Sequence, residues 1–96
     1  MIYFIQRRHR DLIKIGYTKS VPSRLQQIRS QYLPEPVRLL ATMRGGYAVE
    51  DALHKRFHAD LYPGEFEWFR PTAALHELIA EHCARGQVRH QHRVGE

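Results

Sequence analysis

Two short apolar runs near the start of the chain limit its fold most strongly. The run at residues 2–5 is aromatic and β-branched, and the run at 12–15 is mostly leucine and isoleucine. The polar segment 6–11 separates them, and Gly16 follows the second run. Two such runs joined by a short polar loop predict an antiparallel β-hairpin. We expect the second strand of this hairpin to end at Gly16.

The rest of the chain alternates between helix and strand patterns. Ser20 is a favoured N-cap residue, and apolar residues follow it at spacings of four, three and four up to Tyr32, which predicts a helix that ends before Pro34. The later predicted elements are a strand at 37–43, a helix from 48 to about 58, a brief extended segment at 66–69 and a helix that opens at 71–72. The order β-β-α-β-α-(short β)-α predicts an α/β (α+β) fold with a small mixed or antiparallel three-stranded sheet flanked by helices.

A chain of 96 residues is long enough for one domain. We expect that domain at residues 1–84, followed at 85–96 by a basic, flexible C-terminal tail with three arginines. No apolar run approaches the ~20 residues of a membrane helix, so no membrane partner is expected. A single cysteine, Cys83, excludes an internal disulfide and a cysteine-rich zinc site, which favours a cytoplasmic protein. Gly-rich phosphate loops and GxSxG elbows are absent from the sequence.

Charge is distributed unevenly along the chain. Residues 1–44 contain nine basic and two acidic side chains, whereas residues 45–84 contain three basic and seven acidic ones. A basic front half favours an anionic partner such as nucleic acid. No segment has the pattern of a major-groove recognition helix, so we expect selectivity for shape rather than for bases. The expected phosphate contacts are Arg7, Arg8, Arg10, Lys19, Arg29, Arg38 and Arg44.

Several short motifs occur in a fixed order along the chain. Met-Ile-Tyr at 1–3 precedes Lys-Ile-Gly at 14–16, Arg24 lies in the next predicted helix, and Glu50 lies in the helix after the third strand. This set resembles the GIY-YIG nuclease superfamily over roughly residues 1–83. The segments KIGYT…SR, E..LH..F and GE.EWF are most similar to a compact branch known from phage open reading frames and a meiotically up-regulated gene product.

The resemblance implies a metal-dependent endonuclease that hydrolyses phosphodiester bonds in DNA, with RNA left open. It implies that Glu50 holds Mg²⁺ or Mn²⁺, that Arg24 binds the phosphate and that Tyr3 activates the attacking water. Carboxylate oxygen suits these hard cations, and guanidinium offers a planar fork to phosphate. Because a phenol with its usual pKa of ~10 is a poor base, Tyr3 needs a nearby cation, for which Lys14 is the candidate. Lys14 takes over the task of the second tyrosine, or Tyr17 replaces that tyrosine from just beyond the strand end.

His54 follows Glu50 by four residues, so the two side chains project from one side of a helix. It could bind the metal, shuttle a proton or contact phosphate, and a half-buried structural histidine is the equal alternative. Trp68 and Phe69 are expected in the core, with the flanking Glu65 and Glu67 either supporting the site or solvated.

The chain departs from the family pattern at three points. Met1 replaces the glycine of the first motif, Lys14 replaces the tyrosine of the second, and the late asparagine has no counterpart in a chain without asparagine. These departures motivate an alternative, a catalytically weak or inactive nucleic-acid-binding module with the same fold. The acidic segment 45–84 motivates another, a protein-interaction domain. With one small domain, targeting would depend on its own surface, the tail, a second copy in a homodimer or a partner protein.

Overall fold

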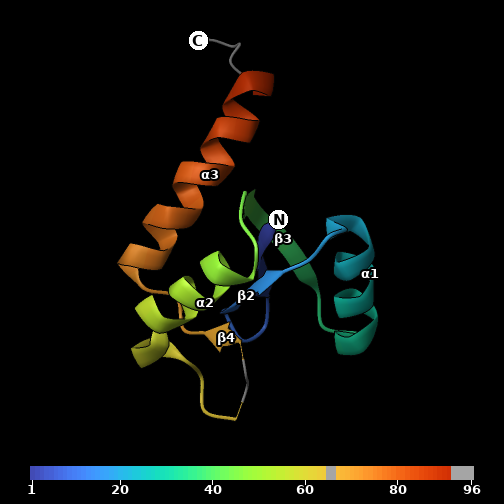
Figure 1. Cartoon of the computed structure of the whole chain (residues 1–96). Coiled ribbons are helices and arrows are strands. Elements are labelled where there is room, and N and C mark those ends of the chain that lie inside the picture. Colours follow the sequence, from blue (N-terminus) through green and yellow to red (C-terminus); the bar gives the residue numbers. More distant parts are fainter. Residues whose placement is uncertain (65–66, 92–96) are drawn as a thin grey trace.

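A four-stranded antiparallel sheet forms the centre of the molecule. The computed structural model describes residues 1–64 and 67–91. The strands are β1 (Ile2–Arg7), β2 (Leu12–Tyr17), β3 (Val37–Met43) and β4 (Trp68–Phe69). They lie in the order β3-β1-β2-β4, and β4 joins the sheet by pairing Phe69 with Ile13 and Trp68 with Lys14 (Figure 1). The predicted α+β fold is confirmed, with one strand more than the three expected because the brief segment near Trp68 pairs with β2.

Helices cover both faces of this sheet. The helices are α1 (Val21–Tyr32), α2 (Tyr47–Arg56) and α3 (Ala73–Gln91), with a short 3₁₀ helix η1 (His58–Asp60) after α2. In Figure 1, α1 lies on one side of the strands and α2 and α3 lie on the other. In the part of the chain that the structure describes, no helix is long and apolar enough to cross a membrane.

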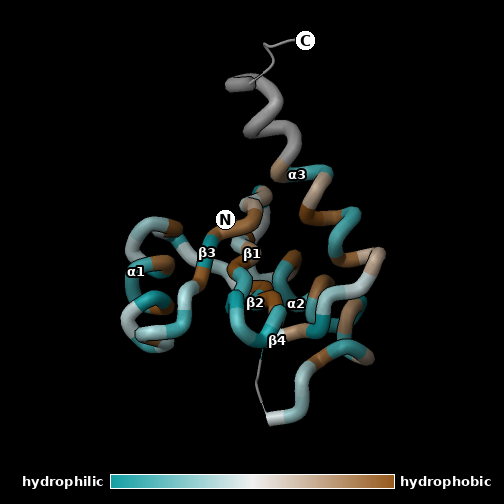
Figure 2. Tube along the Cα trace, turned by 180° about the vertical axis from the view of Figure 1, so that it is seen from behind, coloured by the Kyte–Doolittle hydropathy of each residue, from teal (hydrophilic) through white to brown (hydrophobic). Residues whose placement is uncertain are grey.

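The central strand β1 is buried on both faces. Ile2 and Phe4 pack in the core beneath α2 and α3, whereas Tyr3 and Ile5 pack in the core beneath α1. A strand covered on both sides has an uninterrupted apolar sequence instead of an alternating one. This explains the apolar run at 2–5, and Figure 2 shows the hydrophobic residues gathered along the central strands.

One predicted boundary differs from the structure. Gly16 was expected to end the second strand, but β2 continues through it to Tyr17. The last helix, α3, continues to Gln91, and the domain limit expected at residue 84 stays a prediction. The predicted flexibility of the tail stays a prediction, and residues 92–96 lie outside the described part.

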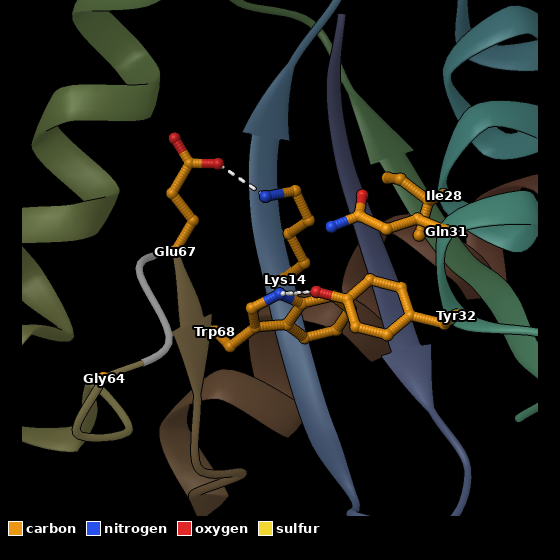
Figure 3. Close-up of a pocket in the computed structure, with 7 residues that line it drawn as sticks. All are labelled: Lys14, Ile28, Gln31, Tyr32, Gly64, Glu67 and Trp68. Atoms are coloured by element: carbon orange, nitrogen blue, oxygen red, sulfur yellow. Dashed lines mark hydrogen bonds and ion pairs between the residues drawn. The ribbon is translucent and has the colours of Figure 1, made fainter.

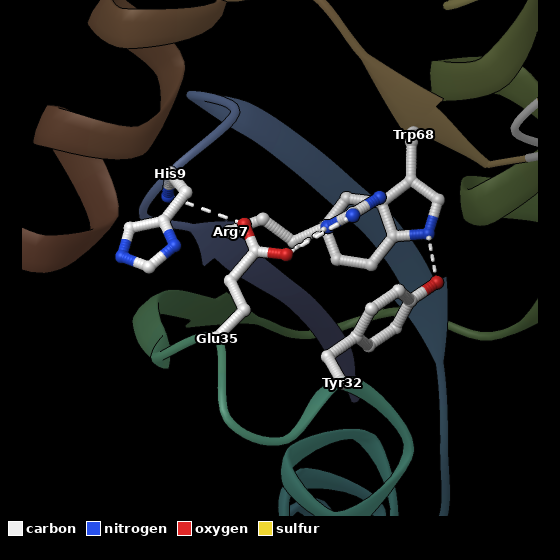
Figure 4. Close-up of polar contacts among 5 residues, drawn as sticks. All are labelled: Arg7, His9, Tyr32, Glu35 and Trp68. Atoms are coloured by element: carbon white, nitrogen blue, oxygen red, sulfur yellow. Dashed lines mark hydrogen bonds and ion pairs between the residues drawn. The ribbon is translucent and has the colours of Figure 1, made fainter.

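Arg7 lies in the core, so the prediction that it contacts phosphate is wrong. Only 7% of the residue is exposed. Its Nη2 and Nε donate to Oε1 of Glu35 at 3.0 and 3.2 Å, and its guanidinium carbon lies 4.4 Å from the Tyr32 ring centroid and 5.4 Å from that of Trp68 (Figure 4). Position 7 of β1 lies beneath α1, where the carboxylate and two aromatic rings compensate the buried charge.

Glu35→Gln is expected to lower the free energy of unfolding by about 2–3 kcal/mol at neutral pH, because the buried guanidinium loses a charged partner. Partial burial raises the pKa of Glu35, but the hydrogen bonds and charge of Arg7 and the N–H of His9 outweigh it and hold that pKa below its usual 4.5. The stabilisation is therefore complete above the usual pKa and is lost as pH falls through the lowered one. Urea unfolding of the parent and of Glu35→Gln, from neutral to acid pH, measures the difference in their free energies of unfolding. A difference that does not shrink in acid contradicts the prediction.

Candidate active site

Tyr3 and Gly16 form the floor of the candidate site. They are register partners on β1 and β2. A Cβ placed on Gly16 would lie 2.8 Å from Tyr3 Cε2 and closer still to the phenol Cζ and hydroxyl oxygen. The Tyr3 ring therefore crosses the backbone of Gly16, and Tyr3 is only 1% exposed. The glycine of the second motif leaves the space that the tyrosine of the first motif fills.

Arg24 from α1 and two carboxylates act on the Tyr3 hydroxyl. Burial is the main cause that raises the pKa of Tyr3 above its usual 10.0, and the negative charges of Glu67 and Glu50 raise it further. Arg24 opposes them through its charge and a hydrogen bond to the Tyr3 side chain. Arg24 and Glu50 are thus both near enough to influence the Tyr3 hydroxyl, whose raised pKa keeps it neutral at neutral pH. That the three residues form one site stays a prediction.

The Tyr3 phenol is expected to ionise above pH 10, and Arg24→Gln is expected to move this ionisation higher still, because the opposing cation is removed. Subtracting the tyrosinate absorbance of Tyr3→Phe from that of the parent isolates this group. Since the pKa is raised in the folded state, the stabilisation by the neutral phenol is complete below pH 10 and is lost as pH rises through the folded-state pKa. A Tyr3 midpoint at or below 10 contradicts the prediction.

Lys14 does not supply the cation predicted for Tyr3. Its Nζ lies 2.6 Å from Oε1 of Glu67 and 5.7 Å from the ring centroid of Trp68 (Figure 3). The lysine occupies the strand position expected from the second motif, but its ammonium group pairs with Glu67. The cation that lowers the Tyr3 pKa is Arg24 instead.

Glu67 is the site residue whose role the sequence left undecided. Its φ of 70° is unusual for a residue other than glycine, and such conformations concentrate at functional sites. Its backbone oxygen accepts from the N–H of Ile15 at 3.2 Å, while its side chain holds Lys14. The position of Glu67 next to Trp68 was the available signal, but the pairing of β4 with β2 that brings it to Lys14 depends on the tertiary structure.

Glu50 and His54 lie one turn apart on α2. Glu50 is half-buried in the first turn of this helix, and no cation forms an ion pair with it in the described part of the chain. His54 Nε2 lies 2.7 Å from the carbonyl oxygen of Ile15, and its ring centroid lies 5.2 Å from that of Phe69. A ring N–H that donates to this carbonyl cannot bind a metal through the same nitrogen. The contact fits the structural alternative, in which His54 fixes α2, and with it Glu50, against β2.

Tyr17 lies on the other face of β2 from Lys14. Its partly buried side chain packs against the core beneath α2 and α3. The ring centroid lies 4.4 Å from that of Tyr47, at the start of α2. This position does not support the expectation that Tyr17 replaces the second tyrosine beside Tyr3.

The other predicted phosphate-contacting residues are exposed, but they lie in different regions. Strand register places Lys19 and Arg44 just beyond the end of the sheet that carries Tyr3. The β1–β2 turn lies at the opposite end of the sheet. Six strand residues separate the two ends, about 20 Å. The cations near the turn are Arg8, Arg10 and Arg38, and Arg29 lies on α1. These cations therefore lie at two ends of the sheet and on α1 instead of in one continuous patch.

The carboxylates limit which metal could bind here. Among the described residues, no group of three or more histidine, cysteine, aspartate or glutamate side chains could hold a metal ion. Closed zinc and calcium sites need more protein ligands than Glu50 alone provides. Mg²⁺ retains several waters and is often bound by one or two carboxylates together with substrate phosphates. A single carboxylate such as that of Glu50 would therefore suit Mg²⁺ or the similar Mn²⁺ rather than zinc or calcium.

Comparison with known proteins gives one family. The model of the T5orf172 domain matches residues 1–90. No curated protein and no solved structure matches the chain. The family match supports a nuclease-like domain with a function related to nucleic acid.

Proposed function

Because the chain belongs to the T5orf172 domain family, we propose that it is a metal-dependent endonuclease of the GIY-YIG type that hydrolyses phosphodiester bonds in DNA. One observation carries the proposal. The charges of Arg24 from α1 and Glu50 from α2 act on the hydroxyl of Tyr3 from β1, which lies beside Gly16. Such a convergence of a phenol, a guanidinium and a carboxylate is what phosphodiester hydrolysis requires.

Arg24 binds the scissile phosphate in this proposal. A guanidinium donates two parallel hydrogen bonds to phosphate oxygens, and it remains charged at any working pH. The charge of Arg24 acts on the Tyr3 hydroxyl, so the guanidinium is near the site before substrate arrives. Preorganised positive charge of this kind stabilises the additional negative charge of the transition state.

Tyr3 orients the attacking water. With its pKa raised, the Tyr3 hydroxyl remains protonated at neutral pH, and its oxygen can accept a hydrogen bond from water while its proton is donated elsewhere. We therefore assign it the positioning of the nucleophile, not its deprotonation in the resting enzyme. Lys14 and Glu67 pair with each other, and this ion pair joins β2 to the residue that precedes β4.

Glu50 holds the divalent cation in the proposal. A bound Mg²⁺ or Mn²⁺ would supply positive charge to the phosphate and the leaving oxygen. Glu50 has no competing ion pair among the described residues, and His54 fixes its helix against β2. The metal on Glu50 and the guanidinium of Arg24 would then contact the same phosphate.

A nicking assay on supercoiled plasmid tests the proposal. The protein is incubated with Mg²⁺ or Mn²⁺, and the expected result is conversion to open-circular and linear DNA that EDTA prevents. A structured RNA of similar length, tested in parallel, decides between the two nucleic acids. If neither the DNA nor the RNA is cleaved with Mg²⁺ or with Mn²⁺, the proposed endonuclease activity is rejected.

A binding module without turnover is the second candidate. The pairing of Lys14 with Glu67 favours it, because the lysine that replaces the second tyrosine already has a partner. This candidate predicts binding whose affinity falls steeply with salt, since neutralised phosphates release counterions. EDTA-sensitive product formation would eliminate it.

A further inference from the structure

A groove beside the candidate active site shares Lys14 and Glu67 with it, but its other lining residues have no part in the proposed chemistry. Its volume is about 350 Å³, within the range of small-ligand sites, about 300–1,000 Å³. It lies between α1 and β4 (Figure 3). The lining residues are Lys14, Ile28, Gln31, Tyr32, Gly64, Glu67 and Trp68.

Aromatic and aliphatic side chains form one wall of this groove. The rings of Tyr32 and Trp68 meet edge to face, with centroids 5.4 Å apart and planes at 80°. Trp68 Nε1 donates to the Tyr32 hydroxyl at 3.0 Å, so these polar atoms are already paired. Ile28 adds an aliphatic surface. Trp68 and Ile28 are only 3% and 4% exposed, so the half-buried Tyr32 offers the apolar surface that a flat ligand would contact.

Polar groups surround the same space on its other sides. Gln31 is exposed on α1, and its side chain extends toward Lys14 in Figure 3. An amide offers both a donor and an acceptor, which matches the edge of a nucleobase. Lys14 and Glu67 form an ion pair at its edge. The groove therefore combines apolar surface, a hydrogen-bonding edge and this ion pair.

We propose that this groove binds one unstacked nucleobase of the nucleic-acid strand whose phosphate lies at Arg24. The proposal rests on the proposed function for the position of that phosphate. Gly16 and Lys14 are two residues apart on β2, about 7 Å, so one nucleotide can extend from the hydroxyl of Tyr3 into the groove. Such a base is available in single strands, overhangs and flaps, which makes the site selective for unpaired nucleotides next to the cleavage point.

Trp68 is the only tryptophan of the chain, so its fluorescence reports directly on this groove. The experiment titrates the full chain, in EDTA to prevent cleavage, with a single-stranded oligodeoxynucleotide and with an abasic strand of the same length and charge. The base-containing strand is expected to change the Trp68 emission saturably, whereas the abasic strand binds without that change.

Gln31→Ala is expected to weaken binding of the base-containing strand about 5- to 10-fold. Gln26→Ala is the matched control, since Gln26 is an exposed glutamine of α1 outside the lining of the groove. Equal emission changes with both strands, or equal effects of the two variants, would overturn the proposal. Tighter binding of free deoxynucleoside monophosphate than of the strand would overturn the strand as the occupant.

The two proposals fail separately. Base-dependent binding that requires Gln31 but comes without plasmid nicking rejects the endonuclease and retains the groove. Nicking without base-dependent emission rejects the groove and retains the endonuclease.

Discussion

Glu50→Gln is expected to lower metal-dependent nicking about 100- to 1,000-fold, because a neutral amide binds Mg²⁺ poorly and the phosphate loses the charge of the metal. Glutamine has nearly the shape of glutamate, so α2 should keep its place. Nucleic-acid binding measured in EDTA should therefore stay within about twofold of the parent, or improve slightly as a negative charge is removed. Initial nicking rates over a range of Mg²⁺ concentrations measure the effect.

Asp51→Asn is the matched control for this variant. Asp51 is the next residue on α2, its side chain is 65% exposed, and it forms an i,i+4 ion pair with Lys55 at 3.0 Å. An exposed pair of this kind contributes little to stability, and it lies outside the proposed site. Parent-like nicking by Glu50→Gln, or an equal loss in Asp51→Asn, would remove Glu50 from the mechanism.

Gly16→Ala is expected to lower the free energy of unfolding by about 3 kcal/mol and to abolish nicking, because the added methyl group enters the space of the Tyr3 ring. The ring lies in a close-packed core, so it can move only by displacing Ile28 or its other neighbours beneath α1. Any such displacement also moves the hydroxyl away from Arg24. Chemical denaturation and the nicking assay measure the two effects on the same protein.

A double-mutant cycle identifies the cause. In a Tyr3→Ala background the space is vacant, so adding Gly16→Ala should cost much less than in the parent. Gly46→Ala is the control, since a Cβ there meets nothing within 4 Å, and it should cost less than about 1 kcal/mol. A Gly16→Ala cost that is independent of Tyr3 would show that the ring is not the obstacle.

Local patterns predicted the elements well because their signals lie within a few residues. The strand expected at 37–43 has those bounds in the structure. Ser20 caps α1 as expected, with its side chain accepting from the N–H of Ser23 at 3.4 Å. Helix ends and strand patterns follow from backbone preferences and from the period of the apolar residues, which the sequence contains directly.

Long-range partners decided the corrections. Arg7 looked like one more surface cation of a basic segment, but Glu35, 28 residues away, neutralises it inside the core. Lys14 looked free to act on Tyr3, but Glu67, 53 residues away, binds its ammonium group. The period of a strand tells which face a side chain occupies, whereas it carries no information about which residue lies opposite.

The sequence by itself determined the order of the elements, the motif positions and the separation of charge along the chain. The tertiary structure alone decided that Gly16 is required for space rather than as a strand end, and that Arg24 is the cation beside Tyr3. It also placed Glu50 and Glu67, which belong to the acidic segment 45–84, where their charges act on the hydroxyl of Tyr3 in the basic segment 1–44. The physical reason is that packing fixes distances between residues far apart in the chain, and a site depends on those distances.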